Sequence, residues 1–357
     1  MLVGVSVYLY FPRTSDQELD KPREVIETIK GRVEETYTNS SRQILNRKDT
    51  HKISLPNHYF QTFNNCGPAT LSMILNYYGI DVTQQVMGDI LRPYQNPQGD
   101  NDDKSVTLPE LAAEAERRGF VAYSRPSGDL EKLKLLISNE IPVVVKTLLE
   151  HGDDVAHYRV VTGFNDAGGF LIQDDSYQGK NKTYLYDDFL DLWRPHNYYY
   201  LVIATKEKSE VVETILGDEV DERVAWQKAL EKAQEDTTTY PTSPFPVFNQ
   251  AVSHYYLGNY AETVALYESV DQELPMRTLW YQLEPLRAYI ELGNYDRALN
   301  IISNILNGGN RAYTELYLLR GEIYEAQGRE DLAQQEYETA LRYNENHAEA
   351  REKLGLQ

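Results

Sequence analysis

The sequence from Gln61 to Gly79 reads QTFNNCGPATLSMILNYYG and contains the single cysteine of the 357-residue chain, Cys66. Glycine and proline follow this cysteine, and apolar residues then recur three and four positions apart. This spacing predicts a helix that begins near Cys66 and ends near Gly79, because proline is tolerated in a first turn and glycine favours a helix end. The positive end of the helix dipole stabilises a thiolate. The stretch therefore predicts a reactive cysteine at the start of an apolar helix.

Composition is typical of a globular protein. Hydrophobic residues make up 41% of the chain, and its length is sufficient for two or three domains. Asp and Glu number 55 against 35 Lys and Arg, which gives a formal net charge of -20. This charge repels nucleic-acid phosphates and anionic lipids. We therefore expect protein, peptide or small-molecule partners and no nucleic acid.

Residues 1–47 are predicted to form an N-terminal apolar segment and a polar arm. The chain begins MLVGVSVYLYFP, which is too short to span a bilayer and has neither the basic leader nor the cleavage site of a signal peptide. The run could be the end of a truncated membrane anchor, or a short strand or disordered end. An anchor would slightly favour an extracytoplasmic or membrane-tethered protein. Localisation stays unknown, and membrane contact is expected only through this segment.

Residues 48–206 show helical windows followed by strand-like runs. The helical windows are CGPATLSMILNYYG, LPELAAEAERRG and DLEKLKLLISNE. The strand-like runs are IPVVVKTLL, HYRVVTGF, GGFLIQDD and YYYLVIAT, and they are joined in part by short turns. Helices followed by consecutive strands predict an α+β domain with an antiparallel sheet.

Residues 207–357 read as amphipathic helices with an internal repeat. LGNY at residues 257–260 recurs 35 residues later at 292–295, and QGRE follows at the same interval at 327–330. The pattern resembles the tetratricopeptide repeat, a helix-turn-helix unit of about 34 residues with glycine at the turn. The preceding helix, VDERVAWQKALEKAQ, is expected to be a cap or a degenerate first unit. An all-α repeat domain that binds a protein partner or substrate is therefore expected here.

A cysteine nucleophile needs a base and a group that orients the base. His157 opens the strand HYRVVTGF, which would hold an imidazole rigidly. If Asn165–Gly169 is a five-residue loop, Arg159 faces Asp175, and Asp175 lies diagonal to His157 on one face. A four-residue loop would instead bring Asp174 to that face. The register therefore leaves two candidate carboxylates.

Gln61 is the candidate for a further catalytic role. Its side-chain amide lies just upstream of the helix, and with the backbone amide of Cys66 it could donate to the oxyanion that forms during acyl transfer. No cofactor or metal is expected. The acidic stretch GDNDDK lacks the glycine and glutamate of a calcium loop, and with one cysteine no zinc spacing occurs. His58, His151 and His196 are interpreted as surface or framework residues.

The motifs QTFNNCGPATLSMILNYYG, AHYRVVTGF and QDDSYQG together resemble the bacteriocin-processing, double-glycine leader peptidases of the papain-like fold, in their stand-alone C39-like branch. The resemblance covers about residues 57–205. It implies that Cys66 is the nucleophile, His157 the base and Asp175, rather than Asp174, the orienting carboxylate, with Gln61 in the oxyanion hole. No transporter or nucleotide-binding motif follows, so coupling to export is not implied.

These observations predict a papain-like cysteine peptidase domain followed by tetratricopeptide-like repeats, with a peptide or protein as substrate. Two other functions share the same features. A catalytically silent peptidase-like fold could bind peptides on a repeat scaffold, although a receptor has no need for nucleophile, base, orienter and oxyanion donor together. A thiol transamidase would use the same groups with an amine as acceptor, and only its products would separate it from a hydrolase.

Overall fold

The structure is a computed structural model that describes residues 46–94 and 106–356. The described residues from Arg47 onward form one compact unit. The predicted N-terminal run and arm therefore lie outside the described residues, except for their last two residues. The stretch GDNDDK also lies outside them.

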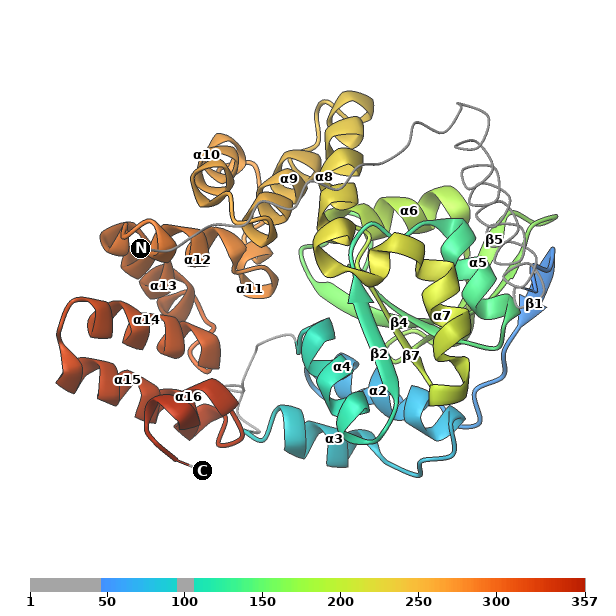
Figure 1. Cartoon of the computed structure of the whole chain (residues 1–357), viewed down its shortest axis with the longest axis horizontal. Coiled ribbons are helices and arrows are strands. Elements are labelled where there is room, and N and C mark those ends of the chain that lie inside the picture. Colours follow the sequence, from blue (N-terminus) through green and yellow to red (C-terminus); the bar gives the residue numbers. More distant parts are fainter. Residues whose placement is uncertain (1–45, 95–105, 357) are drawn as a thin grey trace, which may run out of the picture. The chain divides into compact units, whose positions relative to one another are not determined.

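The first part of this unit is a seven-stranded antiparallel sheet with helices (Figure 1). The sheet order is β2-β7-β3-β4-β5-β6, and β1 pairs with the far end of β4. The strands are β1 (Thr50–Lys52), β2 (Val121–Arg125), β3 (Val143–Leu148), β4 (Ala156–Asn165), β5 (Phe170–Asp175), β6 (Gly179–Leu185) and β7 (Tyr200–Ala204). The helices are α2 (Cys66–Tyr77), α3 (Gln84–Leu91), α4 (Leu108–Arg117), α5 (Leu130–Ser138) and α6 (Tyr186–Trp193), followed by a short 3-10 turn, η1 (Arg194–His196).

The predicted α+β architecture is confirmed. The three helical windows form α2, α4 and α5, and the four strand-like runs form β3, β4, β5 and β7. The elements that the sequence pattern missed are β1, β2, β6, α3 and α6. β2 and β6 lie at the ends of the strand order, and neither has a fully buried face, so the apolar run that marks a buried strand is missing. α3 is only eight residues long and contains a glycine.

Helix α2 packs against β4 and is the central helix of this part. Its residues from Gly67 to Asn76 are all buried. A Cβ atom at Gly67 would lie 3.3 Å from Val106 and 3.6 Å from Tyr158 of β4. The glycine after the cysteine therefore allows the first turn of the helix to approach the strand closely, which brings Cys66 next to the start of β4.

From Ser209 onward the chain is helical. The helices are α7 (Ser209–Leu216), α8 (Glu222–Thr239), α9 (Phe245–Tyr256), α10 (Tyr260–Val270), α11 (Thr278–Tyr281), α12 (Glu284–Glu291), α13 (Tyr295–Asn307), α14 (Thr314–Ala326), α15 (Glu330–Tyr343) and α16 (Ala348–Lys353), and α9 to α16 follow one another in an array (Figure 1). α8 packs against α9, as expected for a cap or first unit.

The predicted interval of 35 residues is visible in the backbone. α10, α13 and α15 begin at Tyr260, Tyr295 and Glu330, which are 35 residues apart. Each is preceded by a turn in which a glycine has a positive φ: Gly258 at 82°, Gly293 at 71° and Gly328 at 70°. Glycine is required there because other residues rarely adopt this conformation. The sequence repeat thus corresponds to a repeated turn between paired helices.

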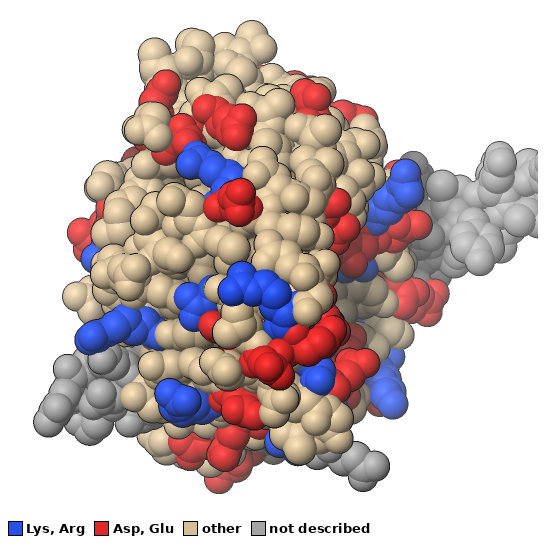
Figure 2. All heavy atoms as spheres, turned by 90° about the vertical axis from the view of Figure 1, so that its left-hand side faces the viewer, with Lys and Arg blue, Asp and Glu red and all other residues tan. Residues whose placement is uncertain are grey.

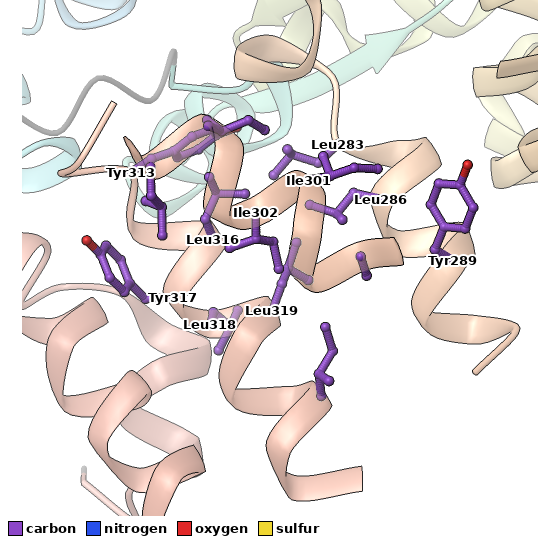
Figure 3. Packing of buried hydrophobic residues seen from close by; sticks show 14 of the residues in the cluster. Leu283, Leu286, Tyr289, Ile301, Ile302, Tyr313, Leu316, Tyr317, Leu318 and Leu319 are labelled. Atoms are coloured by element: carbon purple, nitrogen blue, oxygen red, sulfur yellow. The ribbon is translucent and has the colours of Figure 1, made fainter. Parts of the chain in front are cut away.

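Apolar side chains hold the array together. Figure 3 shows side chains of α12, α13 and α14 meeting between the helices, among them Leu286, Ile302 and Leu316. Small residues set the spacing of the pairs. A Cβ atom at Gly321 of α14 would lie 2.4 Å from the ring of Tyr337 on α15, so any larger residue would push the two helices apart.

The helical array contacts the sheet part at two places. At the first, Lys146 of β3 donates from Nζ to the carbonyl of Tyr281 (3.0 Å), and Asn249 of α9 donates to the carbonyl of Arg194 (2.7 Å). At the second, the turn between α15 and α16 contacts the end of α3, and Tyr343 packs edge-on against Tyr94 with ring centres 5.0 Å apart. Both contacts lie within the compact unit Arg47–Gln357.

The surface of the unit carries charges of both signs. On the face drawn in Figure 2, acidic and basic side chains are interspersed among uncharged ones. Among residues 46–94 and 106–356, no helix has the length and apolarity needed to cross a bilayer.

Candidate active site

Cys66 is the first residue of α2, as the sequence predicts. The residue as a whole is partly exposed, whereas the residues that follow it in the helix are buried. Burial alone raises the pKa of the thiol. The hydrogen bond and charge of His157 oppose this effect together with the amide of Tyr158 and the charge of Arg92, and the net result is a lowered pKa. The site therefore favours a thiolate, the reactive form of cysteine.

His157 lies near the start of β4, and its side chain is 3% exposed. Its Nε2 atom lies 2.9 Å from Oδ1 of Asp175, which leaves Nδ1 for the hydrogen bond with Cys66. Burial lowers the pKa of the imidazole, but the bonds to Asp175 and Cys66 outweigh this and raise the pKa above its ordinary value. The imidazolium and the thiolate thus favour each other, as a nucleophile and its base require.

Asp175 is fully buried at the end of β5 and has four polar contacts. Besides His157, its Oδ2 accepts from Nε of Arg159 at 2.7 Å, and its Oδ1 accepts from the amides of Tyr177 (2.6 Å) and Gln178 (3.0 Å). Burial opposes ionisation, but the bond and charge of His157, followed by the charge of Arg159, hold the pKa of Asp175 far below its ordinary value. The carboxylate is therefore a fixed acceptor for the histidine.

Arg159 fixes this carboxylate from the far side. Its side chain is 1% exposed and donates to the carbonyls of Leu148 (2.9 Å) and Leu149 (2.5 Å) and to the hydroxyl of Thr147. These partners belong to β3 and the residue after it. Because its other guanidinium nitrogens are held by these partners, the arginine is restrained, and so is the carboxylate of Asp175 that accepts from its Nε.

The structure pairs Arg159 with Asp175, as the sequence predicts, but the loop length and the register near the loop differ from the expected ones. Asn165 pairs with Phe170, so the loop has four residues rather than five. The register then shifts between Val161 and Gly163, and this β-bulge restores the pairing of Arg159 with Asp175. The expectation that a four-residue loop would bring Asp174 to His157 is therefore wrong.

Asp174 has a different environment from its neighbour. It pairs with Val160, and because adjacent strand residues point to opposite faces, its side chain lies on the other face of the sheet. Its Oδ1 accepts from the amide of Asn181 in β6 at 2.8 Å. The two neighbouring carboxylates thus have separate environments, and Asp175 is the one beside His157.

Gln61 is held next to the end of β5. Its amide N–H donates to the carbonyl of Ser176 (2.8 Å), and its Oε1 accepts from the hydroxyl of Ser176 (2.8 Å). With Oε1 engaged in this way, the Nε2 group becomes the donor end of the side chain. Gln61 is therefore oriented by Ser176, the residue that follows Asp175.

Helix α3 supports the loop that carries Gln61. Gln84 in its first turn accepts from the amide of Thr62 (3.0 Å) and donates to the carbonyl of Phe60 (2.7 Å), so it bonds on both sides of Gln61. Arg92, the residue after α3, is 1% exposed and donates to the carbonyl of Asn64. Asn64 has a φ of 54°, a conformation that its neighbours must hold in place.

Sequence reasoning placed Arg159 opposite Asp175 but gave it no part in the site, and it missed Ser176, Gln84 and Arg92. Arg159 had a signal, since it lies two residues from His157 on one strand face. Ser176 also had one, because it follows the candidate aspartate. Gln84 and Arg92 had none, since their contacts depend on how α3 packs against a loop more than twenty residues away.

Lys146 of β3 is a further buried cation of the site, beside Arg159 and Arg92. Its side chain is 6% exposed, and burial lowers its pKa to about 8, partly offset by the charges of Glu284 and Cys66. Its Nζ donates to the carbonyl of Tyr281, the last residue of α11. The same ammonium group therefore lies within electrostatic reach of the thiol and fixes the helical array to the sheet.

The other histidines have separate environments. His58 lies 3.0 Å through Nε2 from the carbonyl of Asp175, His196 is buried with Nδ1 3.2 Å from Oε1 of Gln282, and His151 is exposed. Among the residues that the structure describes, no group of three or more His, Cys, Asp or Glu is arranged to hold a metal ion.

The sequence match covers the segment that contains all four candidate residues. Residues 45–201 match the family model described as the Peptidase_C39 like family. We refer to these residues as the C39-like segment. The match and the antiparallel sheet confirm the predicted fold class, a C39-like peptidase fold followed by a helical part. No curated protein matches the chain.

Two solved structures are similar to the C39-like segment. One is described as a C39-like peptidase from Bacillus anthracis, with 13% identity, a TM-score of 0.38 and a match that covers 44% of this chain and 99% of that chain. The other is a double glycine motif protease from an AMS/PCAT transporter in complex with the leader peptide, with 14% identity, a TM-score of 0.33 and coverage of 44% and 95%.

The C39-like segment thus brings Cys66, His157 and Asp175 into one hydrogen-bonded series, with Gln61 beside it. A thiol with a lowered pKa next to a base and an amide donor has the groups needed for acyl transfer.

Proposed function

We propose that this protein is a cysteine peptidase that hydrolyses a peptide bond through Cys66, His157 and Asp175, with Gln61 as oxyanion donor. The observation that carries the proposal is the series from the thiol to His157 and from His157 Nε2 to Asp175 Oδ1 at 2.9 Å. A structural cysteine needs neither a histidine partner nor a buried carboxylate behind it.

The reaction begins with His157 holding the proton of the Cys66 thiol. The thiolate attacks the carbonyl carbon of the substrate, and the carbonyl oxygen becomes an oxyanion that accepts hydrogen bonds from Nε2 of Gln61 and the amide of Cys66. His157 gives its proton to the leaving amine, and a thioester remains. Water then attacks the thioester, His157 takes a proton from the water and returns it to the sulfur, and the carboxylic acid product leaves.

Asp175 positions His157 in this mechanism. Its carboxylate accepts from Nε2 and so fixes the tautomer that directs Nδ1 to the thiol. Arg159 keeps the carboxylate ionised and holds its orientation. These two residues therefore act on the rate through His157 and do not contact the substrate.

We infer further that the helical array presents or selects a peptide or protein substrate. Helices α9, α12, α14 and α16 place Arg287 within electrostatic reach of Tyr255, Glu315, Glu322 and Glu349. This Arg287 cluster mixes one cation with carboxylates and an aromatic ring, which suits the charged and apolar groups of an extended peptide. Its support is that the array is fixed to the C39-like segment at two places.

Covalent trapping tests the peptidase. A peptide with a thiol-directed electrophile is incubated with the wild type, Cys66→Ala and His157→Ala. We expect labelling of the wild type, none of Cys66→Ala and much slower labelling of His157→Ala. Undiminished labelling of His157→Ala would contradict an activated pair. Product analysis with an added amine separates hydrolysis from transamidation.

Charge reversal tests the array. Arg287→Glu should raise the KM for a protein substrate and leave labelling by a small electrophile unchanged. Arg329→Glu, which replaces an arginine that packs on Tyr324 outside this cluster, is the matched control. Equal KM values for the two variants would contradict substrate selection by the Arg287 cluster.

A further inference from the structure

Helix α3 contacts the loop before Cys66 at three points. Gln84 at its start bonds to Phe60 and Thr62, on both sides of Gln61. In its middle, a Cβ atom at Gly88 would lie 3.2 Å from Nδ2 of Asn65, the residue before the nucleophile. Beyond its end, Arg92 donates to the carbonyl of Asn64.

These contacts make the position of α3 important for the site. The residues of this loop belong to neither a helix nor a strand, and Asn64 adopts a positive φ. Arg92 is buried, and its positive charge acts on the thiol of Cys66. A displacement of α3 would therefore move the oxyanion donor Gln61 and a cation that favours the thiolate.

The end of α3 is held by the helical array. The last carbonyls of a helix have no partner within it and must find one elsewhere. Asn346 donates from Nδ2 to the carbonyls of Asp89 (3.2 Å) and Ile90 (3.0 Å), and Asn344 donates to the carbonyl of Leu91 (3.4 Å). Both asparagines lie in the turn between α15 and α16, more than 250 residues from α3 in the sequence.

This turn is itself well held. Asn344 is 4% exposed, and its Oδ1 accepts from the amide of Asn346 at 3.1 Å. Its carbonyl accepts from the amide of His347 at 3.0 Å. Tyr343 packs against Tyr94, two residues beyond Arg92, and also against Tyr317. The turn can therefore act as a fixed cap for α3.

We propose that the turn between α15 and α16 holds α3 against the loop that carries Gln61 and Asn64, so that the last helical repeat sets the reactivity of Cys66 through Arg92. Arg92 and the two asparagines are positioning residues. The array is then part of the assembly of the site, in addition to any contact it makes with substrate.

The charged and polar groups around the thiol come from three elements. His157 and the amide of Tyr158 belong to β4, Lys146 belongs to β3, and Arg92 follows α3. Of these groups, only Arg92 is linked to the turn between α15 and α16, because it directly follows the α3 residues that this turn contacts. Loss of those contacts should therefore weaken one positive charge and leave the bond between His157 and Asp175 in place.

The test is the rate of alkylation of Cys66 by iodoacetamide as a function of pH, in the full chain. Because Cys66 is the only cysteine, all incorporated label reports on it. The variants are Asn346→Ala, which removes an exposed side chain, the double variant Asn344→Ala/Asn346→Ala, and Arg92→Gln. Asn304→Ala is the control, since Asn304 is an exposed asparagine of α13 that bonds to Asn300 (3.1 Å) away from α3.

We expect the double variant and Arg92→Gln to raise the thiol pKa and to slow alkylation at neutral pH by about three- to tenfold, because less thiolate is present. Asn346→Ala should change the rate in the same direction, and Asn304→Ala should not change it. When Arg92→Gln is already present, the asparagine substitutions should have no further effect, since the two act through one group.

The proposal is overturned if folded Asn346→Ala and the double variant alkylate like the wild type at every pH. The proposal is also overturned if the asparagine substitutions slow alkylation equally in the wild type and in Arg92→Gln. The proposal is independent of peptide hydrolysis, because iodoacetamide needs only the thiolate. If the proposed peptidase activity were absent, the shift of the alkylation profile in these variants could therefore still be measured.

Discussion

Arg159 and Asp175 form a buried ion pair across the β4–β5 ladder, with Nε 2.7 Å from Oδ2. The other oxygen of the same carboxylate accepts from His157. One face of two adjacent strands therefore carries a continuous series from arginine to aspartate to histidine, and from the histidine to the thiol of α2. The ion pair is what fixes the far end of this series.

Substitution of Asp175 by Asn should reduce turnover by about 10⁴, because an amide in place of the carboxylate favours the wrong tautomer of His157. The amide can still accept from Arg159, but loss of its charge leaves the buried guanidinium without a counter-ion, and a lower unfolding midpoint is expected as well. The measurement is kcat on a peptide substrate, with the midpoint of urea unfolding measured alongside.

Asp174→Asn is the matched control for this prediction. Asp174 lies on the other face of the sheet and bonds to the amide of Asn181, so its substitution should change turnover far less. A larger loss of turnover in Asp174→Asn than in Asp175→Asn would contradict the assignment.

The pH dependence of the Cys66–His157 pair follows from its shifted pKa values. The thiolate forms as the pH rises through the lowered pKa of Cys66, and the imidazolium is lost as the pH rises through the raised pKa of His157. The rate should therefore be bell-shaped, with its acid limb below the ordinary cysteine value of about 8.5. In His157→Ala, where burial remains without the imidazolium, alkylation of Cys66 should move to a higher midpoint. A wild-type midpoint at or above the ordinary value would indicate a structural cysteine.

Gln61→Ala should lower kcat by about 10² to 10³ with little change in KM, because the oxyanion exists only in the transition state. Ser176→Ala removes the hydroxyl that orients Gln61 and should lower kcat in the same direction by a smaller factor. Ser269→Ala is the control, since Ser269 is an exposed serine of α10 that donates to the carbonyl of Leu266. A Ser176→Ala enzyme with the wild-type kcat would show that Gln61 keeps its orientation without this bond.

Lys146 makes stability depend on pH in a definite direction. Its pKa is about 8 in the folded chain, below the unfolded value of about 10.4, so the unfolded state binds more protons between these values. Stability should therefore rise with pH through this range, by about 1 kcal/mol per pH unit, before other groups titrate. Urea unfolding at pH 8 and pH 9 measures this change.

Lys146→Met should abolish this rise, because it removes the buried ammonium group. The matched control is Lys180→Met, since Lys180 is an exposed lysine that also donates to a backbone carbonyl, that of Leu55 at 2.6 Å. The same pH dependence in Lys146→Met as in the wild type would contradict the burial of this charge.

The sequence alone determined the elements with strong local patterns. Cys66 was placed at the start of a helix by the glycine and proline after it, and the repeat of 35 residues was read from three turns that require a positive φ. His157 and Asp175 were placed on one face because side chains alternate along strands. The catalytic roles of these residues stay predictions.

Other features depended on contacts between distant segments, which local patterns do not encode. The hairpin loop is one residue shorter than expected, and only the bulge between Val161 and Gly163 returns Asp175 to Arg159, because the packing of the sheet decides where a ladder gains a residue. Arg92 and Asn346 lie on separate parts of the chain, and their relation to Cys66 exists only after α3 and the last helices have packed together. The sequence thus determined which groups have the chemistry, and the tertiary structure decided which of them meet.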